Sequence, residues 1–336
     1  MKMPRRTTLV RWAATALHGA RLLGPLSRTA GYARRQPAFP ILTYHRVNDD
    51  RDPFFPSVPT AVFERHVAYL ARTHRVLTVE ELVERSGRGE VPRHALAITF
   101  DDGYRDNLTH AAPILARYGL PATIFLATGF IGTAEVPWFD RLAMAFKTAK
   151  LSSVGAPWGE QVNLGDDQAR LQALERTLGY LKGLRDGERR RQVDRLLHSL
   201  AGTDQSWFKD LMLGWDDVHA LAGLGFSIGA HTVSHPILSR VSRKQARAEI
   251  EGSRAMIESA CGVAPQAFAY PNGRPDDYTA TVRDLVQEVG FACAVTTRFG
   301  LNTRATPRYE LRRGGPWEHD VATFGLKLAI YRAIER

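Results

Sequence analysis

The chain has 336 residues, 44% of them hydrophobic and 24% charged, which is ordinary for a globular protein and suits one large domain with insertions. Its net charge of +10 comes mostly from residues 1–36, which carry eight basic residues and no acid; the nearly neutral remainder argues against a nucleic-acid-binding surface. The two cysteines, Cys261 and Cys293, have no C-x-x-C spacing, which argues against a disulfide framework and a thiolate metal site.

Residues 1–37 form the first predicted segment, a basic amphipathic helix. Its apolar face would hold Leu9, Trp12, Ala16, Ala20 and Leu23. This pattern predicts peripheral contact with a membrane, and we favour the cytoplasmic face of the inner membrane. Arg11 and Arg21 interrupt the segment too often for a transmembrane helix. The Arg5-Arg6 pair resembles a twin-arginine export signal, so export is the alternative, with an unstructured basic arm as a third interpretation.

Short apolar runs alternate with helical stretches from residue 38 to about residue 320. The runs predict buried strands at 39–45, 95–100, 122–127, 226–231, 267–271 and 291–297. The stretches between them predict helices at 60–72, 78–85, 108–118, 216–223, 242–260 and 278–289. Asp216 is the expected cap of the fourth helix. Because no glycine-rich phosphate motif accompanies this alternation, we expect an α/β fold with a distorted TIM-like (β/α) barrel at 38–320.

Two segments depart from this alternation. Residues 133–215 predict a helical insertion between two strands, with one apolar side formed by Leu171, Leu174, Leu178 and Leu181. This insertion could act as a lid, as an interaction surface or as a structural cap. Residues 321–336 predict an amphipathic C-terminal tail whose apolar side holds Phe324, Leu328 and Tyr331.

Polar side chains stand at the ends of the predicted strands, namely His45, Asp101 with Asp102, His231 and Tyr270. The carboxyl ends of barrel strands meet on one face, where barrel enzymes hold their catalytic groups. His231 and His235 are four residues apart and can share one cation. A carboxylate from a neighbouring strand end would complete the two-His, one-carboxylate set of a catalytic zinc site.

The adjacent carboxylates of Asp101 and Asp102 disfavour each other's ionisation. Neighbours on a strand face opposite ways, so both can enter one site only if the strand gives way to a turn, which Gly103 permits. A divalent cation bound by one carboxylate would leave the other ionised, as a base. The alternative is that Asp102 caps the helix at 108–118 while Asp101 lies on the surface.

Three ordered motifs resemble those of the polysaccharide deacetylases, carbohydrate esterase family four: TFDDGY at 99–104, HTVSH at 231–235 and YPNG at 270–273. The resemblance runs from about residue 38 to 318. It implies a distorted barrel and a hydrolase that removes N-acetyl, sometimes O-acetyl, groups from sugars. The expected substrate is a glycan or glycan precursor of the N-acetylhexosamine type. The expected cofactor is one divalent metal ion, zinc, with cobalt, nickel or manganese as alternatives.

The resemblance also implies roles for individual residues. Asp101 corresponds to the general base that acts on a water at the metal. The metal ligands correspond to Asp102, His231 and His235. The backbone N–H of Tyr270 is expected to help to stabilise the oxyanion of the reaction.

Two positions depart from the family pattern. Ala269 stands where many members have the arginine that holds the base, and Arg312 or Arg313 is expected to replace it. The late Leu-x-His motif that supplies the general acid is missing. His45 is the expected acid, because the early Tyr-His pair is similar to the branch of the family that acts on biofilm-type exopolysaccharide. A structural role for His45 is the alternative.

Substrate contacts are expected from side chains that can stack on a sugar ring or bind its hydroxyls, namely Tyr44, Tyr104, Trp138 and Arg312, with Trp317 as a further candidate. Two other functions stay open. The GFSIG stretch at 225–229 matches a serine-hydrolase elbow with Ser227 as nucleophile, although Ser227 lies inside an apolar run. A non-catalytic carbohydrate-binding protein on the same fold is the second alternative.

Overall fold

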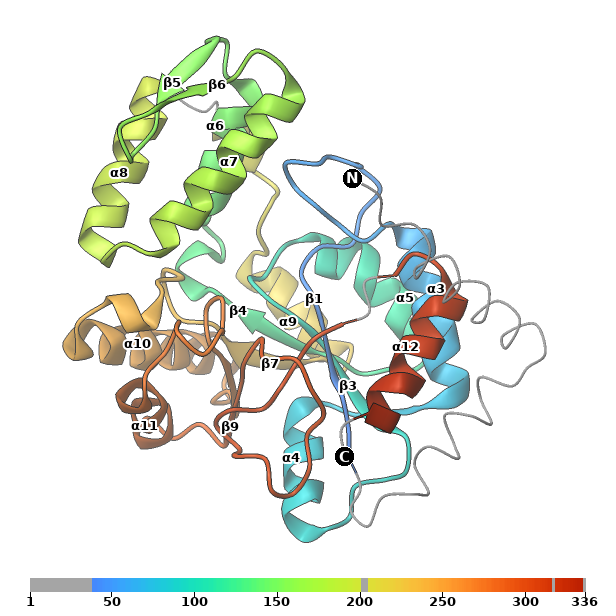
Figure 1. Cartoon of the computed structure of the whole chain (residues 1–336). Coiled ribbons are helices and arrows are strands. Elements are labelled where there is room, and N and C mark those ends of the chain that lie inside the picture. The colour runs from blue at the N-terminus through green and yellow to red at the C-terminus, as the bar shows by residue number, and fades with distance from the viewer. Residues whose placement is uncertain (1–37, 201–204, 316–317, 335–336) are drawn as a thin grey trace.

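The computed structural model describes residues 38–200, 205–315 and 318–334 (Figure 1). Within this part of the chain, seven strands form one parallel sheet that curls into a distorted barrel. Its main path runs β1 (Ile41–Tyr44), β3 (Ala95–Phe100), β4 (Thr123–Leu126), β7 (Ser227–Ala230), β8 (Ala267–Ala269) and β9 (Cys293–Val295), and β2 (Arg75–Val76) pairs with β3. The expected α/β barrel is therefore confirmed, and each of the six predicted strands is present.

An extended segment, Leu311–Gly314, bridges the gap between the two edges of this sheet. Leu311 pairs in parallel with Val295 of β9, and the Gly314 N–H donates to the Ile41 carbonyl of β1 at 3.1 Å. The barrel therefore closes through a piece of chain that is not a regular strand. Any side chain on the inner side of this piece enters the barrel.

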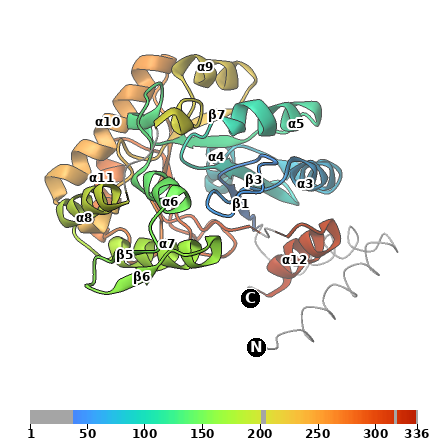
Figure 2. The ribbon, with the colours of Figure 1, turned by 90° about the horizontal axis from the view of Figure 1, so that it is seen from above.

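Helices cover the outside of the sheet (Figure 2). They are α3 (Thr60–Thr73), α4 (Val79–Arg88), α5 (Ala112–Arg117) after the turn η1 (Asn107–Ala111), α9 (Trp215–Gly223), α10 (Arg243–Cys261) and α11 (Ala280–Glu288). Side-chain oxygens of Thr78, Ser242 and Thr279 accept the backbone N–H three residues on, which starts α4, α10 and α11. The six predicted helices are confirmed within a few residues at their ends.

The expected cap Asp216 is wrong, because α9 begins one residue earlier than predicted. Gly214 is the N-cap residue, and its backbone N–H donates to the Asp217 carboxylate at 3.0 Å. Asp217, at the third helical position, therefore accepts the N–H of the N-cap residue, as the acid of a capping box does.

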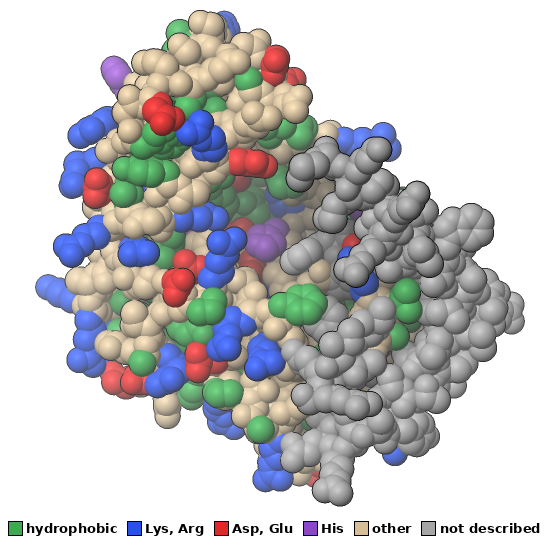
Figure 3. Space-filling view, viewed as in Figure 1, with side chains coloured by type: hydrophobic (Ala, Val, Ile, Leu, Met, Phe, Trp, Pro, Cys, Tyr) green, Lys and Arg blue, Asp and Glu red, His purple; other side chains and the backbone are tan. Residues whose placement is uncertain are grey.

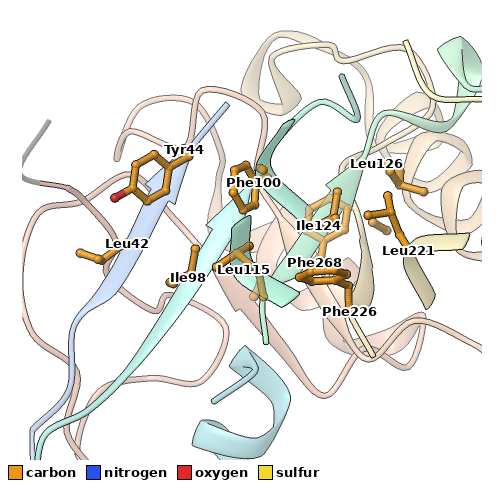
Figure 4. Close-up of a cluster of buried hydrophobic side chains, with 14 of the residues drawn as sticks. Leu42, Tyr44, Ile98, Phe100, Leu115, Ile124, Leu126, Leu221, Phe226 and Phe268 are labelled. Carbon is orange, nitrogen blue, oxygen red and sulfur yellow. The ribbon is translucent and has the colours of Figure 1, made fainter. Parts of the chain in front are cut away.

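Alternation along the strands separates two apolar cores. Outward residues such as Ile98 and Phe100 pack under the helices (Figure 4). The inward residues of β3 and β8 are small, and the Phe125 ring fills the space that they leave. Gly229 of β7 makes room for this ring, since a Cβ there would lie 2.4 Å from Phe125 Cδ1.

The insertion between β4 and β7 forms a separate lobe beside the barrel (Figure 1), and its hydrophobic core also includes Phe54, Phe55 and Tyr104. After the turn η2 (Thr128–Phe130) it comprises α6 (Trp138–Thr148), the hairpin β5 (Ser153–Gly155) and β6 (Gln161–Asn163), α7 (Asp167–Lys182), α8 (Asp186–Ser199) and the turn η3 (Gln205–Phe208). The leucine stripe predicted a helix where α7 lies. The helices α6 and α8 and the hairpin were not predicted as separate elements.

The last helix, α12 (Val321–Ile334), packs on α3. The Phe324 ring stacks on His66 with 3.9 Å between centroids, and Leu328 is buried in the same core. The predicted basic segment at 1–37 lies outside the described residues. Among the described helices, none combines the length and the apolar character that crossing a membrane requires.

The variant Gly229→Ala tests the packing of the barrel interior. The added methyl would clash with the Phe125 ring, so we expect the free energy of unfolding to fall by about 1–3 kcal/mol. Urea denaturation measures it. The matched control is Gly179→Ala on the exposed side of α7, where no described atom lies within 4 Å of the new Cβ. The free energy of unfolding of that control should rise by roughly 0.5–1 kcal/mol. Equal changes in the two variants would contradict a clash between the new methyl and Phe125.

Candidate active site

Asp101 and Asp102 end strand β3 and are both buried, with exposed fractions of 2% and 3%. Asp101 continues the inward side of the strand. Asp102 has a φ of 75° and Gly103 a φ of 86°, so the chain turns at once and presents the second carboxylate to the same site. The alternative in which Asp102 caps a helix is wrong, because the next helical turn has Asp106 as its N-cap residue.

The HTVSH loop follows strand β7 and is held in an unusual backbone conformation. Thr232 and His235 have φ values of 67° and 53°. Glu249 of α10 accepts the backbone N–H groups of Val233 and Ser234 at 3.0 and 2.8 Å, and it also accepts the Ser234 hydroxyl. Glu249 therefore orients both histidines of the loop without touching either.

Asp102, His231 and His235 bring three donor atoms together. Asp102 Oδ1 lies 3.5 Å from His231 Nε2 and 3.4 Å from His235 Nε2. Two ligands about 2.1 Å from one tetrahedral zinc ion are about 3.4 Å apart, so the spacing fits such an ion. Asp102 Oδ1 is buried and has no hydrogen-bond partner among the described residues. The three residues therefore fit a divalent cation.

The protonation states of these side chains suit a cation as well. Burial lowers the pKa of His231 to about 4 and that of His235 well below its ordinary value, so both rings are neutral at pH 7. His231 Nδ1 donates to the Ala269 carbonyl at 2.7 Å, which leaves the Nε2 lone pair for a metal. Burial, then the charges of Asp101 and Asp140, raises the pKa of Asp102, and a bound cation would reverse that effect.

Arg313 holds Asp101 with two hydrogen bonds. Its Nη1 and Nη2 donate to Asp101 Oδ1 and Oδ2 at 2.7 and 2.8 Å, and its Nε donates to the Thr296 carbonyl at 3.0 Å. The guanidinium is fully buried. Burial raises the pKa of Asp101, but the charge and hydrogen bonds of Arg313, together with the charges of His231 and His45, outweigh burial and hold the pKa below its ordinary value. Asp101 is therefore ionised at neutral pH.

The pair of Arg313 and Asp101 shows which arginine replaces the one that is missing at Ala269. The guanidinium comes from the segment that closes the barrel and not from the strand that carries Ala269. Of the two arginines considered, the structure brings Arg313 to Asp101. Arg312 is half-buried, and its backbone N–H donates to Asn302 Oδ1 at 2.8 Å.

His45 stands at the end of β1, with its Nε2 4.0 Å from Asp101 Oδ2. Its side chain is about half exposed, at 51%, so it can reach both Asp101 and an incoming ligand. Desolvation lowers the pKa of His45, and the Asp101 charge opposes this shift.

A cavity of about 530 Å³ opens beside the metal ligands, between the barrel and the insertion. His45, Asp102 and Tyr104 line its barrel end, and α6, α7 and the loop after β1 form its other walls. Figure 3 shows a hollow between these two parts, with a histidine and hydrophobic side chains on its walls.

The predicted aromatic contacts divide into two groups. Tyr44 and Tyr104 line the cavity, although the Tyr104 hydroxyl donates to Asp140 at 2.8 Å. Trp138 does not line it, because its ring packs inside the insertion under the Arg189 guanidinium, 5.0 Å away. Arg312 is not part of the lining either. Trp317 lies outside the described residues.

The expected role of Tyr270 is wrong. Its backbone N–H donates to the Val295 carbonyl at 3.2 Å, which is part of the pairing between β8 and β9. Its hydroxyl donates to the Tyr309 carbonyl at 3.0 Å, and its ring stacks on Tyr278. Strand alternation directs the side chain outward, away from the site, and the sheet occupies the N–H.

The Ser227 alternative also fails. Ser227 is the first residue of β7, so it lies at the opposite end of the strand from His231. Its hydroxyl donates to Glu80 at 2.8 Å. A nucleophile elbow needs a sharp turn at the serine, and here the serine is inside the sheet.

Three residues near the site were not predicted from the sequence. Phe139 of α6 packs against the His235 ring with 5.1 Å between centroids, and Asp140 lines the cavity beside it. Nothing in the sequence marked Phe139 or Asp140 as site residues, because the insertion contains no motif. Glu249 did carry a signal, since it is the single charged residue on the buried stripe of Ala246, Glu249, Ile250, Ser253 and Ile257 in α10.

The sequence model of the polysaccharide deacetylase family matches residues 88–294, more than half of the chain. The chain therefore belongs to the polysaccharide deacetylase family, and it is a carbohydrate deacetylase.

Relatives share this family at low identity. The Bacillus subtilis (strain 168) protein YxkH, which bears a polysaccharide deacetylase name, is 22% identical over 276 residues, covering 82% of this chain and 70% of that relative. A poly-beta-1,6-N-acetyl-D-glucosamine N-deacetylase of Staphylococcus aureus (strain MSSA476) is 35% identical over 89 residues. That match covers 26% of this chain and 30% of the relative.

Solved structures share the fold. IcaB from Ammonifex degensii superimposes with a TM-score of 0.57 at 19% identity, covering 86% of this chain and 98% of that one. The Streptococcus pyogenes deacetylase PplD gives a TM-score of 0.56 at 19% identity, with coverages of 83% and 92%. At these identities the likeness concerns the fold alone.

The variant Arg313→Met tests the buried ion pair. It leaves Asp101 buried without its counter-charge, so we expect the free energy of unfolding at pH 7 to fall by about 3–5 kcal/mol in urea denaturation. The double variant Arg313→Met with Asp101→Asn should lose less of its free energy of unfolding than the single variant, because it leaves no unpaired buried carboxylate. Arg308→Met, at an exposed arginine, is the control and should stay within about 0.5 kcal/mol of wild type.

Proposed function

We propose that this carbohydrate deacetylase removes N-acetyl groups from N-acetylhexosamine units of a glycan or glycan precursor, with one divalent metal ion. The observation that carries the proposal is the pairing of two adjacent carboxylates with different partners. Asp102 faces two neutral histidines, and Asp101 faces a buried guanidinium. A binding protein has no need of an ionised base beside three metal donors. The name of the Staphylococcus aureus relative supports N-acetylglucosamine as the sugar.

Asp102, His231 and His235 would hold the cation. When bound, a zinc ion supplies Lewis acidity to the acetamide carbonyl and makes water more acidic. Zinc is our preferred ion, because two imidazoles and one carboxylate form the donor set of catalytic zinc sites. Cobalt, nickel or manganese remain alternatives in the same set.

Asp101 is the proposed general base. It is ionised because Arg313 opposes the effect of burial on its pKa, and both its oxygens are held in place by the guanidinium. It would accept the proton of the water that attacks the acetamide carbonyl carbon. Arg313 is a positioning residue, since it acts on the substrate only through Asp101.

His45 is the proposed general acid. His45 lines the cavity, and its Nε2 lies 4.0 Å from Asp101 Oδ2. A proton that Asp101 takes from water can therefore be passed to the imidazole. The protonated ring then donates to the departing sugar nitrogen, which leaves as a neutral amine while acetate forms. His319 also lines the cavity, but no described contact joins it to Asp101.

Variants of the two aspartates should separate catalysis from metal binding. Asp101→Asn is expected to lower kcat for acetate release by about 10²–10⁴-fold while zinc affinity, measured by chelator competition, is retained. Asp102→Asn should lose zinc binding. Asp194→Asn, at an exposed position of α8, is the control. Full activity of Asp101→Asn would defeat the assignment of the base.

The variant His45→Ala tests the general acid with two kinds of substrate. On an N-acetylglucosamine oligomer, kcat should fall about 10²–10⁴-fold, because the amine must be protonated to leave. On 4-nitrophenyl acetate the loss should be small, because nitrophenolate leaves without a proton. Equal losses on both substrates would show a structural role for His45. His319→Ala is the companion variant, and we expect it to keep the activity of the wild type on both substrates.

A further inference from the structure

A second cavity adjoins the one beside the metal ligands. It lies between the loop after β1 and the end of the insertion, and its volume is about 270 Å³. Arg46 and Phe55 line both cavities, so the two cavities meet at these side chains. An apolar cavity of about 150 Å³ already admits benzene, so the second cavity has room for a six-membered ring. Its other lining residues are Asp50, Asp52, Met144, Trp207, Phe208, Asp210 and Leu211.

Trp207 gives the second cavity an exposed indole ring. It lies in the turn η3, and 57% of the residue is exposed. Lys147 Nζ lies 4.6 Å from the centre of this ring and also donates to Asp52 at 2.5 Å, so the ring is held by a cation that is itself held in place. An indole that is held in this way offers a ligand a large contact area at a low cost in side-chain entropy.

Carboxylates outnumber basic groups in the wall of the second cavity. Asp50, Asp52 and Asp210 line it, whereas Arg46 is the single basic side chain among its described lining residues. Asp210 also pairs with Arg105 at 2.6 Å. An ionised carboxylate offers about four acceptor sites, so these side chains can still accept hydroxyl groups after such pairing. Like charges at an interface repel, so the same wall disfavours a phosphate or another anion.

We propose that the second cavity is a sugar subsite that binds a further unit of the glycan chain whose N-acetyl group is removed at the metal ligands. The Trp207 ring packs against the apolar C–H face of the sugar, and the carboxylates accept its hydroxyls. The substrate class is therefore a glycan of several units, and not a single sugar or a sugar carried on a phosphate. This inference rests on the proposed function, since it extends the same site.

A series of substrate lengths tests the inference on the zinc-loaded full chain. The probes are N-acetylglucosamine and its oligomers of two to about six units, in β-1,4 and β-1,6 linkage, and acetate release is measured. We expect kcat/KM to rise at least about tenfold once an oligomer reaches the second cavity, because the Trp207 ring becomes buried. Acetate release that does not depend on length would overturn the inference and leave the proposed function standing. No acetate from any probe would overturn both.

Variants of Trp207 are the matched test. Trp207→Ala should lower the ratio of kcat/KM for the longest oligomer to that for the single sugar at least about tenfold. Trp207→Phe keeps an aromatic face and should retain most of the ratio. Trp158→Ala removes the same side chain from the loop between β5 and β6, where it lines neither cavity, and should keep the ratio within about twofold of wild type. An unchanged ratio in Trp207→Ala would contradict the subsite.

A binding measurement separates a sugar from a lipid carrier. Among the described residues, Trp207 is the one tryptophan that lines either cavity. The longest oligomer should therefore change the tryptophan fluorescence of Asp101→Asn, and the change should be lost when Trp207→Phe is added. A polyprenyl phosphate in detergent should leave the fluorescence unchanged. A response to the polyprenyl phosphate and none to the oligomer would assign the second cavity to a lipid carrier and overturn the inference.

Discussion

The buried pair of Arg313 and Asp101 is the interaction on which the site depends. A carboxylate with 2% exposure next to a second buried carboxylate would otherwise bind a proton. The guanidinium supplies the counter-charge from inside the barrel, on the segment that joins β9 to β1. The segment that closes the barrel therefore also keeps Asp101 ionised, because it carries Arg313. A buried pair of this kind tolerates the loss of neither partner.

The two aspartates have separate partners because of backbone geometry. Asp101 keeps the inward direction of strand β3 and meets Arg313. Asp102 leaves the strand with a positive φ and meets the two histidines. The loop that holds those histidines also has positive φ values, and Glu249 stabilises it from α10. The site thus combines a rigid barrel with two strained turns, each supported by hydrogen bonds from elsewhere in the fold.

The insertion has a different role from the barrel. It supplies none of the three metal donors, but its helices α6 and α7 form an apolar wall of the cavity beside them. The candidate metal donors and the apolar wall beside them therefore come from separate parts of the chain.

The sequence alone determined the alternating strands and helices of the barrel and the three residues of the candidate metal site, because periodicity is local and the motifs TFDDGY and HTVSH are short. It also showed that an arginine was missing at Ala269. It did not decide between Arg312 and Arg313, nor show that sheet pairing occupies the Tyr270 N–H and that Trp138 packs away from the cavity. Those outcomes depend on which strands become neighbours and on which way each residue faces. Only the tertiary structure brought Arg313 to Asp101, since 212 residues separate them along the chain.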